Sequence, residues 1–238
     1  GETIRTIVYA VLIAGVIRTL AYEPFNIPSE SMLPTLLVGD YLFVSKYSYG
    51  YSRHSLPWSP PLFSGRIVED MPERGDVAVF KLPRDNSTDY IKRIIGLPGD
   101  RIQMKGGQLF LNGKLVVRKR VEDFAYKDGF GNVYFVPQYQ ETLPNGAAYK
   151  TLDLLQDSDH DDTDVYLVPP GHYFAMGDNR DNSLDSRIVS AVGLIPAENL
   201  VGRAEILFFS TDGSARFWEI WNWPFAVRYG RLFDGLRA

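Results

Sequence analysis

The hydrophobic and polar positions divide the chain into an apolar start and a longer body with strand-like patterning. Residues 4–22 are almost all apolar, and Arg5 and Arg18 are the charged ones among them. The uncharged run between these arginines is shorter than the roughly 20 residues of a spanning helix. Both arginines lie near its ends, where long side chains can reach lipid headgroups, so residues 1–22 are predicted to form a helical membrane anchor. A buried core helix and a cleaved leader are the alternatives, although residues 21–24 make a poor cleavage site.

Beyond Pro24 the pattern changes to short runs of β-branched and aromatic residues, which are typical of strands. Turn-forming residues separate these runs, drawn from the 21 glycines and 15 prolines of the chain. Asn112-Gly113, between two such runs, predicts a tight two-residue hairpin. No long stretch after Tyr22 has the period of a helix, so the body is predicted to be mainly β. The predicted strands are residues 41–44, 77–80, 90–95, 109–111 and 206–209.

Two stretches rich in loop-forming residues interrupt this pattern, residues 47–73 and about 105–168. The second contains a run of aspartates whose spacing resembles half of a calcium-binding loop. Asp162 and Val168 stand where such a loop needs glycine and glutamate, so a solvated acidic loop is the preferred interpretation. The basic run 118–120 is interpreted in a similar way, as an exposed strand end.

The composition narrows the chemistry that the chain can perform. Its 25 basic and 29 acidic residues give a net charge of −4, which argues against binding nucleic acid by phosphate neutralisation. The absence of cysteine removes disulfides, thiolate zinc sites and cysteine nucleophiles together. The three histidines, His54, His160 and His172, are far apart in the sequence. An enzyme built on this chain must therefore work with little imidazole.

Three polar segments are the candidates for chemistry, and the first spans residues 27–36. It holds Ser29, Glu30 and Ser31 between two prolines, which bias the backbone to extended conformations. An extended Ser-x-Ser puts both hydroxyls on one face and the glutamate on the other. Taken alone, the segment also fits a loop that joins the apolar start to a sheet.

The second segment, residues 89–100, reads as a strand with Tyr90, Lys92 and Ile94 on one face. Burial of that face would disfavour the ammonium and lower the pKa of Lys92 from about 10.4. A lysine that is neutral near pH 7–8 can act as a general base. Arg93, on the other face, keeps its proton. The alternative is an edge strand from which Lys92 reaches solvent.

The third segment, residues 177–187, holds three aspartates, two arginines, two asparagines and two serines. This composition predicts an internally hydrogen-bonded loop that supports a site, and a merely exposed polar loop is the alternative. The segment 216–225 carries three of the four tryptophans. Its aromatic rings are expected either to pack on the β body or to contact a membrane, with nearby arginines meeting lipid phosphates.

Together these segments resemble bacterial type I signal peptidases, the membrane-bound serine endopeptidases that remove signal peptides from exported proteins. The matching stretches are P-S-E-S-M-L-P-T-L followed by V-G-D, then R-G-D-V-A-V-F, then D-Y-I-K-R-I-I-G-L-P-G-D, and then G-D-N-R-D-N-S-L-D-S-R. They occur in the family's order after an apolar segment, and the resemblance runs to about Ala204 apart from the two loop-rich stretches. Glu30 departs from the family, which more often has glycine there.

The resemblance implies a Ser-Lys dyad that needs no histidine, metal or cofactor, with Ser31 as nucleophile and Lys92 as general base. The Ser29 hydroxyl and the Ser31 backbone N–H would form the oxyanion hole. The implied supporting contacts are those of Ser183 with Lys92, Asp178 with Arg93 and Asp185 with Arg187. Shallow apolar pockets for small side chains would be lined by Phe25, Ile27, Pro28, Met32, Leu36, Val79, Tyr90 and Ile91.

The implied fold is mainly β: a signal-peptidase-type catalytic module with an inserted second β subdomain and an N-terminal transmembrane helix. Residues 1–22 would be the anchor, 23–104 with 169–238 the catalytic domain, and 105–168 the insertion. The implied location is the bacterial inner membrane, with the catalytic domain on the periplasmic side. The expected partners are signal peptides of preproteins and the lipid bilayer, with no nucleic acid, and the protein is expected to be monomeric.

Three other interpretations are weighed against this one. A self-cleaving repressor-type protease shares the Ser-Lys chemistry but would carry a helix-turn-helix before the serine, where this chain has an apolar segment. A processing peptidase dedicated to a conjugation or pilus system would use the same machinery. A membrane-anchored module that binds signal peptides without cleaving them is a different class of protein. The presence of both Ser31 and Lys92 argues against that last class.

Overall fold

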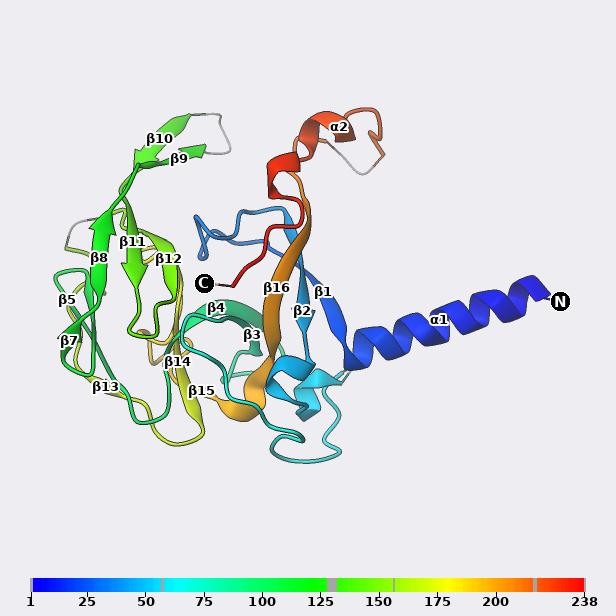
Figure 1. The fold of residues 1–238 in the computed structure, drawn as a ribbon, viewed down its shortest axis with the longest axis horizontal. Helices are drawn as coiled ribbons and strands as arrows, with labels where there is room; N and C mark the ends of the chain where they lie inside the picture. The colour runs from blue at the N-terminus through cyan, green and yellow to red at the C-terminus, as the bar shows by residue number, and fades with distance from the viewer. Residues whose placement is uncertain (1, 57, 128–131, 156, 216–217, 238) are drawn as a thin grey trace.

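The structure is a computed structural model that describes residues 2–56, 58–127, 132–155, 157–215 and 218–237. Within these residues the strands form four sheets, and the body is mainly β as predicted (Figure 1). Helical turns are short apart from the N-terminal helix α1 (Glu2–Leu20). They are η1 (Tyr47–Tyr49), η2 (Arg53–Ser55), η3 (Ala197–Asn199), α2 (Trp223–Ala226) and η4 (Tyr229–Arg231).

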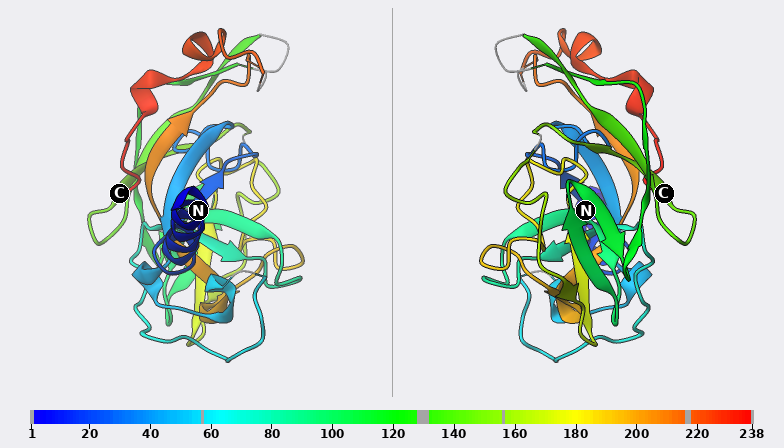
Figure 2. Two further views of the ribbon diagram at one scale, coloured as in Figure 1. Left: turned by 90° about the vertical axis from the view of Figure 1, so that its right-hand side faces the viewer. Right: turned by 90° about the vertical axis from the view of Figure 1, so that its left-hand side faces the viewer.

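The N-terminal apolar segment is a single helix that projects away from the body (Figure 1). Figure 2 shows this helix end-on in front of the curved main sheet. Apolar side chains along it are exposed, among them Ile4 and Val11, each at 66%. The helix itself is confirmed, and the alternative of a buried core helix is wrong. In place of the predicted transmembrane span, however, the described residues hold no helix with both the length and the hydropathy needed to cross a membrane.

The main sheet has seven antiparallel strands in the order β1-β2-β16-β3-β4-β14-β15. Register shifts in its longest strand, β16, two against β2 and one against β3, bend the sheet, since a bulge adds local twist. Four of the five predicted strands fall in this sheet and are confirmed. Its strands are β1 (Tyr22–Asn26), β2 (Asp40–Ser45), β3 (Val77–Lys81), β4 (Asp89–Gly96), β14 (His172–Met176), β15 (Ile195–Pro196) and β16 (Leu200–Ser210).

Three smaller sheets come almost entirely from the second loop-rich stretch. One has the order β13-β5-β6-β7, another β12-β11-β8, and the third is the hairpin β9–β10. Asn112 and Gly113 form the predicted turn between β6 and β7, and the φ angles of 53° and 77° suit a type I′ hairpin. The strands are β5 (Arg101–Lys105), β6 (Gln108–Leu111), β7 (Lys114–Leu115), β8 (Val117–Arg120), β9 (Phe124–Lys127), β10 (Val133–Val136), β11 (Gln138–Thr142), β12 (Ala148–Leu152) and β13 (Tyr166–Leu167).

Strand β4 lies inside the main sheet, between β3 and β14. Residues 92–96 are all buried, because separate apolar clusters cover both faces of the strand. Ile94 belongs to one cluster and Ile95 to another. The alternative of an edge strand that exposes Lys92 is therefore wrong.

The serine-containing segment is less extended than its prolines predict. Beyond Glu30 the chain turns, because the Leu33 N–H donates to the Glu30 carbonyl at 3.1 Å and the Leu36 N–H donates to the Met32 carbonyl at 2.9 Å. These turns direct the side chains of Met32 and Leu36 into the core of the main sheet. The extended geometry holds only for the residues before the turn.

A buried ion pair joins the smaller sheets to the third polar segment. Arg180 Nη1 donates to Glu141 Oε1 of β11 at 2.8 Å, and the Tyr149 hydroxyl donates to Oε2 at 2.9 Å. Glu141 is 1% exposed and Arg180 is 5% exposed. Burial alone would lower the pKa of Arg180, but Glu141 outweighs burial and raises it. The charges therefore depend on each other for compensation.

We expect Glu141→Gln to lower the free energy of unfolding by about 3–5 kcal/mol, because it leaves the Arg180 charge buried without a carboxylate. Denaturant unfolding of the purified protein measures this. The matched control is Asp123→Asn, which breaks the exposed pair with Arg120 and should lower the free energy of unfolding much less, because water and salt screen that pair. Equal costs for the two variants would contradict the importance of the buried pair.

Candidate active site

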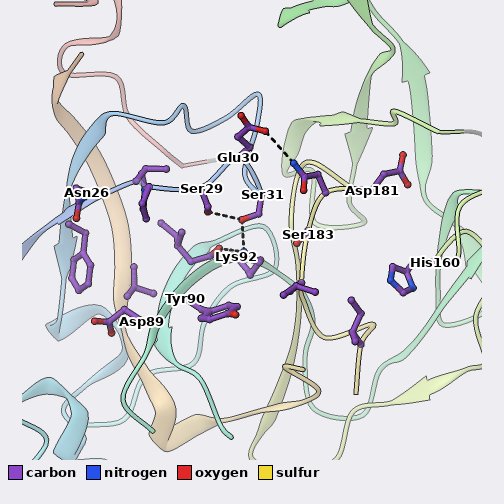
Figure 3. Close-up of a pocket in the computed structure, with 18 residues that line it drawn as sticks. Asn26, Ser29, Glu30, Ser31, Asp89, Tyr90, Lys92, His160, Asp181 and Ser183 are labelled. Carbon is purple, nitrogen blue, oxygen red and sulfur yellow. Dashed lines mark hydrogen bonds between the residues drawn. The ribbon is translucent and has the colours of Figure 1, made fainter. Parts of the chain in front are cut away.

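A cavity of about 650 Å³ lies where β1, β4, the serine-containing segment and the third polar segment meet (Figure 3). Ser31 comes from the turn after β1, and Lys92 comes from the middle of β4. Their functional atoms are in contact, because Lys92 Nζ and Ser31 Oγ share a hydrogen bond of 2.6 Å. Both residues are buried, at 4% and 9% exposure. The fold thus joins two residues that lie 61 positions apart in the sequence.

The surroundings of Lys92 favour the neutral amine. Burial is the main cause, and it lowers the pKa of Lys92 to about 8. The carboxylates of Asp185 and Asp178 act in the opposite direction and raise the pKa, without offsetting burial. Nζ also donates to the Ile91 carbonyl at 2.9 Å. A primary amine with this pKa, in contact with a serine hydroxyl, is suited to accept the proton of that hydroxyl.

Ser29 and Ser31 present their hydroxyls to the same side, with 3.4 Å between the two Oγ atoms. The Glu30 side chain points the other way (Figure 3). This is the arrangement that the alternation of an extended Ser-x-Ser predicts. A carbonyl attacked by Ser31 would develop its negative charge near these groups, where the Ser29 hydroxyl and the Ser31 N–H can donate hydrogen bonds.

Two buried ion pairs support the site from the third polar segment. Arg93 donates to both oxygens of Asp178, at 2.8 and 2.6 Å, and Thr35 donates to the same carboxylate at 2.5 Å. Arg187 donates to both oxygens of Asp185, each at 2.9 Å. Burial would raise the pKa of Asp185, but Arg187 outweighs burial and holds it below its ordinary value. The two contacts implied for these four residues are present.

Ser183 lies beside the dyad and lines the cavity, but it makes a different contact from the one implied. Within the described residues no hydrogen bond joins its Oγ to Lys92. It packs instead against Gly177, where an added Cβ would come within 2.2 Å of the Ser183 Oγ and 2.5 Å of the Ser31 carbonyl oxygen. Glycine at 177 is therefore required for the close approach of these two serines.

Six of the eight residues implied for the substrate pockets line the cavity. They are Phe25, Ile27, Pro28, Val79, Tyr90 and Ile91. Met32 and Leu36 do not, because the turn after Glu30 places both in the core with 0% exposure. Their contact with substrate would be indirect, through the residues that they support.

Several lining residues were missed by the sequence analysis. His160 lies at the end of the cavity away from Asn26 and Asp89, although its segment is predicted as a solvated loop (Figure 3). No local pattern signals this position, because the folding of residues 105–168 as a whole brings the loop there. The other missed residues are Asn26, Glu30, Asp89, Asp181, Asn182, Leu184 and Ile188. Each lies within a few positions of a predicted site residue, and that closeness in sequence is the signal that would have found them.

The chain is similar in sequence to proteins of one family. The family described as "Signal peptidase, peptidase S26" matches residues 1–209. Signal peptidase I of Rickettsia typhi is 40% identical over 247 residues, covering 96% of this chain and 90% of that protein. Signal peptidase I of Rickettsia canadensis is 40% identical over 251 residues, covering 98% and 92%.

Among solved structures, a signal peptidase I from Enterococcus faecalis V583 is 23% identical with a TM-score of 0.33, covering 56% of this chain and 97% of that one. The family match spans most of the chain, and the Rickettsia proteins align with nearly all of it. The chain therefore belongs to the signal peptidase family, peptidase S26, and is a hydrolase of the serine peptidase class.

Proposed function

We propose that the protein removes signal peptides from exported preproteins, cutting after a small-x-small motif, with Ser31 as nucleophile and Lys92 as general base. The observation that carries this proposal is the 2.6 Å contact between a buried, pKa-lowered amine and a serine hydroxyl in an open cavity. Family membership supports the reaction class, and the Rickettsia relatives bear the name signal peptidase I.

The reaction begins when neutral Lys92 takes the proton of Ser31 as Oγ attacks the carbonyl carbon of the scissile bond. The oxyanion accepts hydrogen bonds from the Ser29 hydroxyl and the Ser31 N–H. The Lys92 ammonium then gives its proton to the leaving amine, and an acyl-enzyme remains on Ser31. Lys92 next takes a proton from a water molecule as the water oxygen attacks the ester carbonyl. The Lys92 ammonium then returns this proton to Ser31 Oγ as the ester bond breaks, which releases the signal peptide and leaves the serine hydroxyl and the neutral lysine restored.

The apolar half of the cavity suits the residues before the cut. Ile27, Val79 and Ile91 bring branched aliphatic side chains to its wall, and Tyr90 adds an aromatic ring. Bulky walls leave shallow pockets, which favour alanine-sized side chains at the first and third positions before the scissile bond. A small-x-small motif meets this requirement.

The proposed division of the chain follows sheet membership. Strands of residues 23–104 and 169–238 supply most of the main sheet, and we assign these residues to the catalytic domain. We assign residues 105–168 to an inserted β subdomain, whose strands pair in the smaller sheets. Strand β5 lies mostly before the insertion and pairs with β6 and β13 within it.

We also propose that the protein is monomeric and acts at the periplasmic face of the inner membrane, attached through α1 and residues 1–22. The exposed apolar side chains of this projecting helix support attachment, because such surface is costly to leave in water. The aromatic tail supports a second contact. Trp218, Trp221 and Phe225 are 65%, 67% and 84% exposed, whereas packing on the body would have buried them. Residues 216–217 of the predicted tail lie outside the described residues.

We expect Ser31→Ala to abolish cleavage of a preprotein while leaving the thermal unfolding midpoint unchanged, because it deletes one small hydroxyl. Ser29→Ala should keep residual activity, with kcat lower by roughly 10²–10³-fold, because the backbone donor remains. Gel analysis and N-terminal sequencing of the product measure both effects. Ser190→Ala, at an exposed position outside the cavity, is the control. Near-wild-type cleavage by the Ser31→Ala protein would overturn the nucleophile assignment.

The pH dependence should report Lys92. Activity should rise with pH as Lys92 loses its proton, with a midpoint in kcat/KM near pH 8, matching the lowered pKa. Lys92→Met and Lys92→Arg should both be inactive, because guanidinium keeps its charge but cannot accept a proton. Lys114→Arg, on the exposed strand β7, controls for the substitution itself. An active Lys92→Arg enzyme, or a midpoint near the ordinary lysine value, would indicate another base.

The tail prediction is tested by tryptophan fluorescence of the full chain in lipid vesicles. Trp58→Phe leaves the three tail tryptophans as the reporters among the four of the chain. Lipids brominated near the headgroup should quench this fluorescence, because interfacial rings lie at that depth. Aqueous iodide, applied to the same protein, is the control. Strong quenching by iodide with none by brominated lipid would place the tail in water and contradict the contact.

A further inference from the structure

Glu30 stands between the two serines of the site, and its carboxylate is held on the opposite side of the chain from their hydroxyls. The Tyr126 hydroxyl donates to Oε1 at 2.7 Å. The Asn182 amide donates to Oε2 at 3.3 Å, the dashed line at Glu30 in Figure 3. Both carboxylate oxygens therefore have a donor, and the two donors come from different parts of the fold.

The backbone around Glu30 is fixed as well. The Asn179 side chain donates to the Glu30 carbonyl at 3.1 Å, and the Asn179 N–H donates to the Ser31 carbonyl at 3.1 Å. Asn179 is 2% exposed, so these bonds are shielded from water. The third polar segment thus holds the main chain of residues 30–36, the serine turn. The insertion also contacts the serine turn, because its Tyr126 hydroxyl donates to the Glu30 carboxylate.

Tyr126 belongs to β9, in the two-stranded hairpin that pairs with none of the other sheets of the described structure. Figure 1 shows this hairpin projecting from the body. A two-stranded hairpin is marginally stable alone and needs packing at its base. The base of the hairpin packs against the serine turn in a small apolar cluster. Its buried members are Leu33, Val136 and Leu152, and Leu37, Phe124 and Tyr126 pack against them. The hairpin therefore contacts the serine turn both through this cluster and through Glu30.

We propose that Glu30 is a positioning residue for the reaction, and that the Tyr126 hydroxyl fixes the Ser29–Ser31 geometry through the Glu30 carboxylate. This inference rests on the proposed Ser-Lys mechanism. Ser31 supplies both the nucleophile and an oxyanion donor, so the turn must hold two reacting groups in register with Lys92 and the substrate. A displacement of about 1 Å in such groups can cost 10²-fold in rate. A hydrogen bond to a charged acceptor is strong enough to limit that displacement.

The test compares kcat and KM for Tyr126→Phe, Glu30→Ala and the double variant. Each single change should lower kcat by about tenfold, the worth of one charge-assisted hydrogen bond, with KM within about twofold of wild type. The double variant should be no slower than the slower single variant, because both changes break the same link. Glu30→Gln should recover most of kcat, since its amide oxygen still accepts from Tyr126. Tyr134→Phe is the matched control, because Tyr134 pairs with Tyr126 across the hairpin.

Two further measurements separate positioning from general stability. The midpoint of the pH–rate profile and the thermal unfolding midpoint should both stay at their wild-type values while kcat falls. The proposal would be overturned by a wild-type kcat in Tyr126→Phe. It would also be overturned if the losses in kcat multiplied in the double variant, or if unfolding of the variants explained the loss. Ser31→Ala in the same assay distinguishes the two levels of inference. An inactive Ser31→Ala protein keeps the Ser-Lys mechanism even if the proposed role of Glu30 is wrong. An active Ser31→Ala protein would overturn both the mechanism and the role of Glu30.

Discussion

An amine loses its proton readily only where water cannot solvate the ammonium, and the placement of Lys92 supplies that condition. It lies in an interior strand whose neighbours on both sides are part of the same sheet. Its burial lowers its pKa to about 8, although two aspartates nearby act against the shift. The main sheet with its bulges shields this amine from water. The turn that brings Ser31 over β4 puts a hydroxyl in contact with it. In the proposed mechanism the general base is a lysine desolvated by burial, so that mechanism needs no imidazole.

The charges around the dyad are arranged so that they do not reverse this effect. Arg93 follows Lys92 in the chain and lies on the opposite face of the strand, where Asp178 accepts two hydrogen bonds from it. Asp185 likewise accepts two hydrogen bonds from the Arg187 guanidinium. Each carboxylate near the amine is thereby neutralised by a guanidinium, and its pull on the Lys92 proton is reduced. A buried ion pair is costly in itself, but here it lets carboxylates lie near Lys92 while their effect on its pKa is reduced.

Local patterns in the sequence predict most of the fold, whereas the pairing of Ser31 with Lys92 is implied by the family resemblance. Period-two alternation in residues 90–95 places Lys92 and Arg93 on opposite faces, and Asn112-Gly113 marks its hairpin by turn chemistry alone. Patterns of this kind do not predict what depends on long-range packing. The turn after Glu30 sends Met32 and Leu36 into the core, and the insertion brings His160 to the cavity and Tyr126 to Glu30. The Tyr126–Glu30 bond spans 96 positions, a separation at which no local period carries information.

The serine turn is held from two directions, and the difference between them has a physical consequence. The third polar segment binds it through the buried backbone contacts of Asn179, which substitution elsewhere cannot easily alter. The insertion binds it through one side-chain carboxylate and a small apolar cluster at the base of a projecting hairpin. The contacts of Asn179 hold the main chain of the turn, whereas in our proposal the contact of Tyr126 with Glu30 sets the position of the two hydroxyls. The proposed positioning of the serines therefore depends on the base of the β9–β10 hairpin, which keeps the Tyr126 hydroxyl within reach of Glu30.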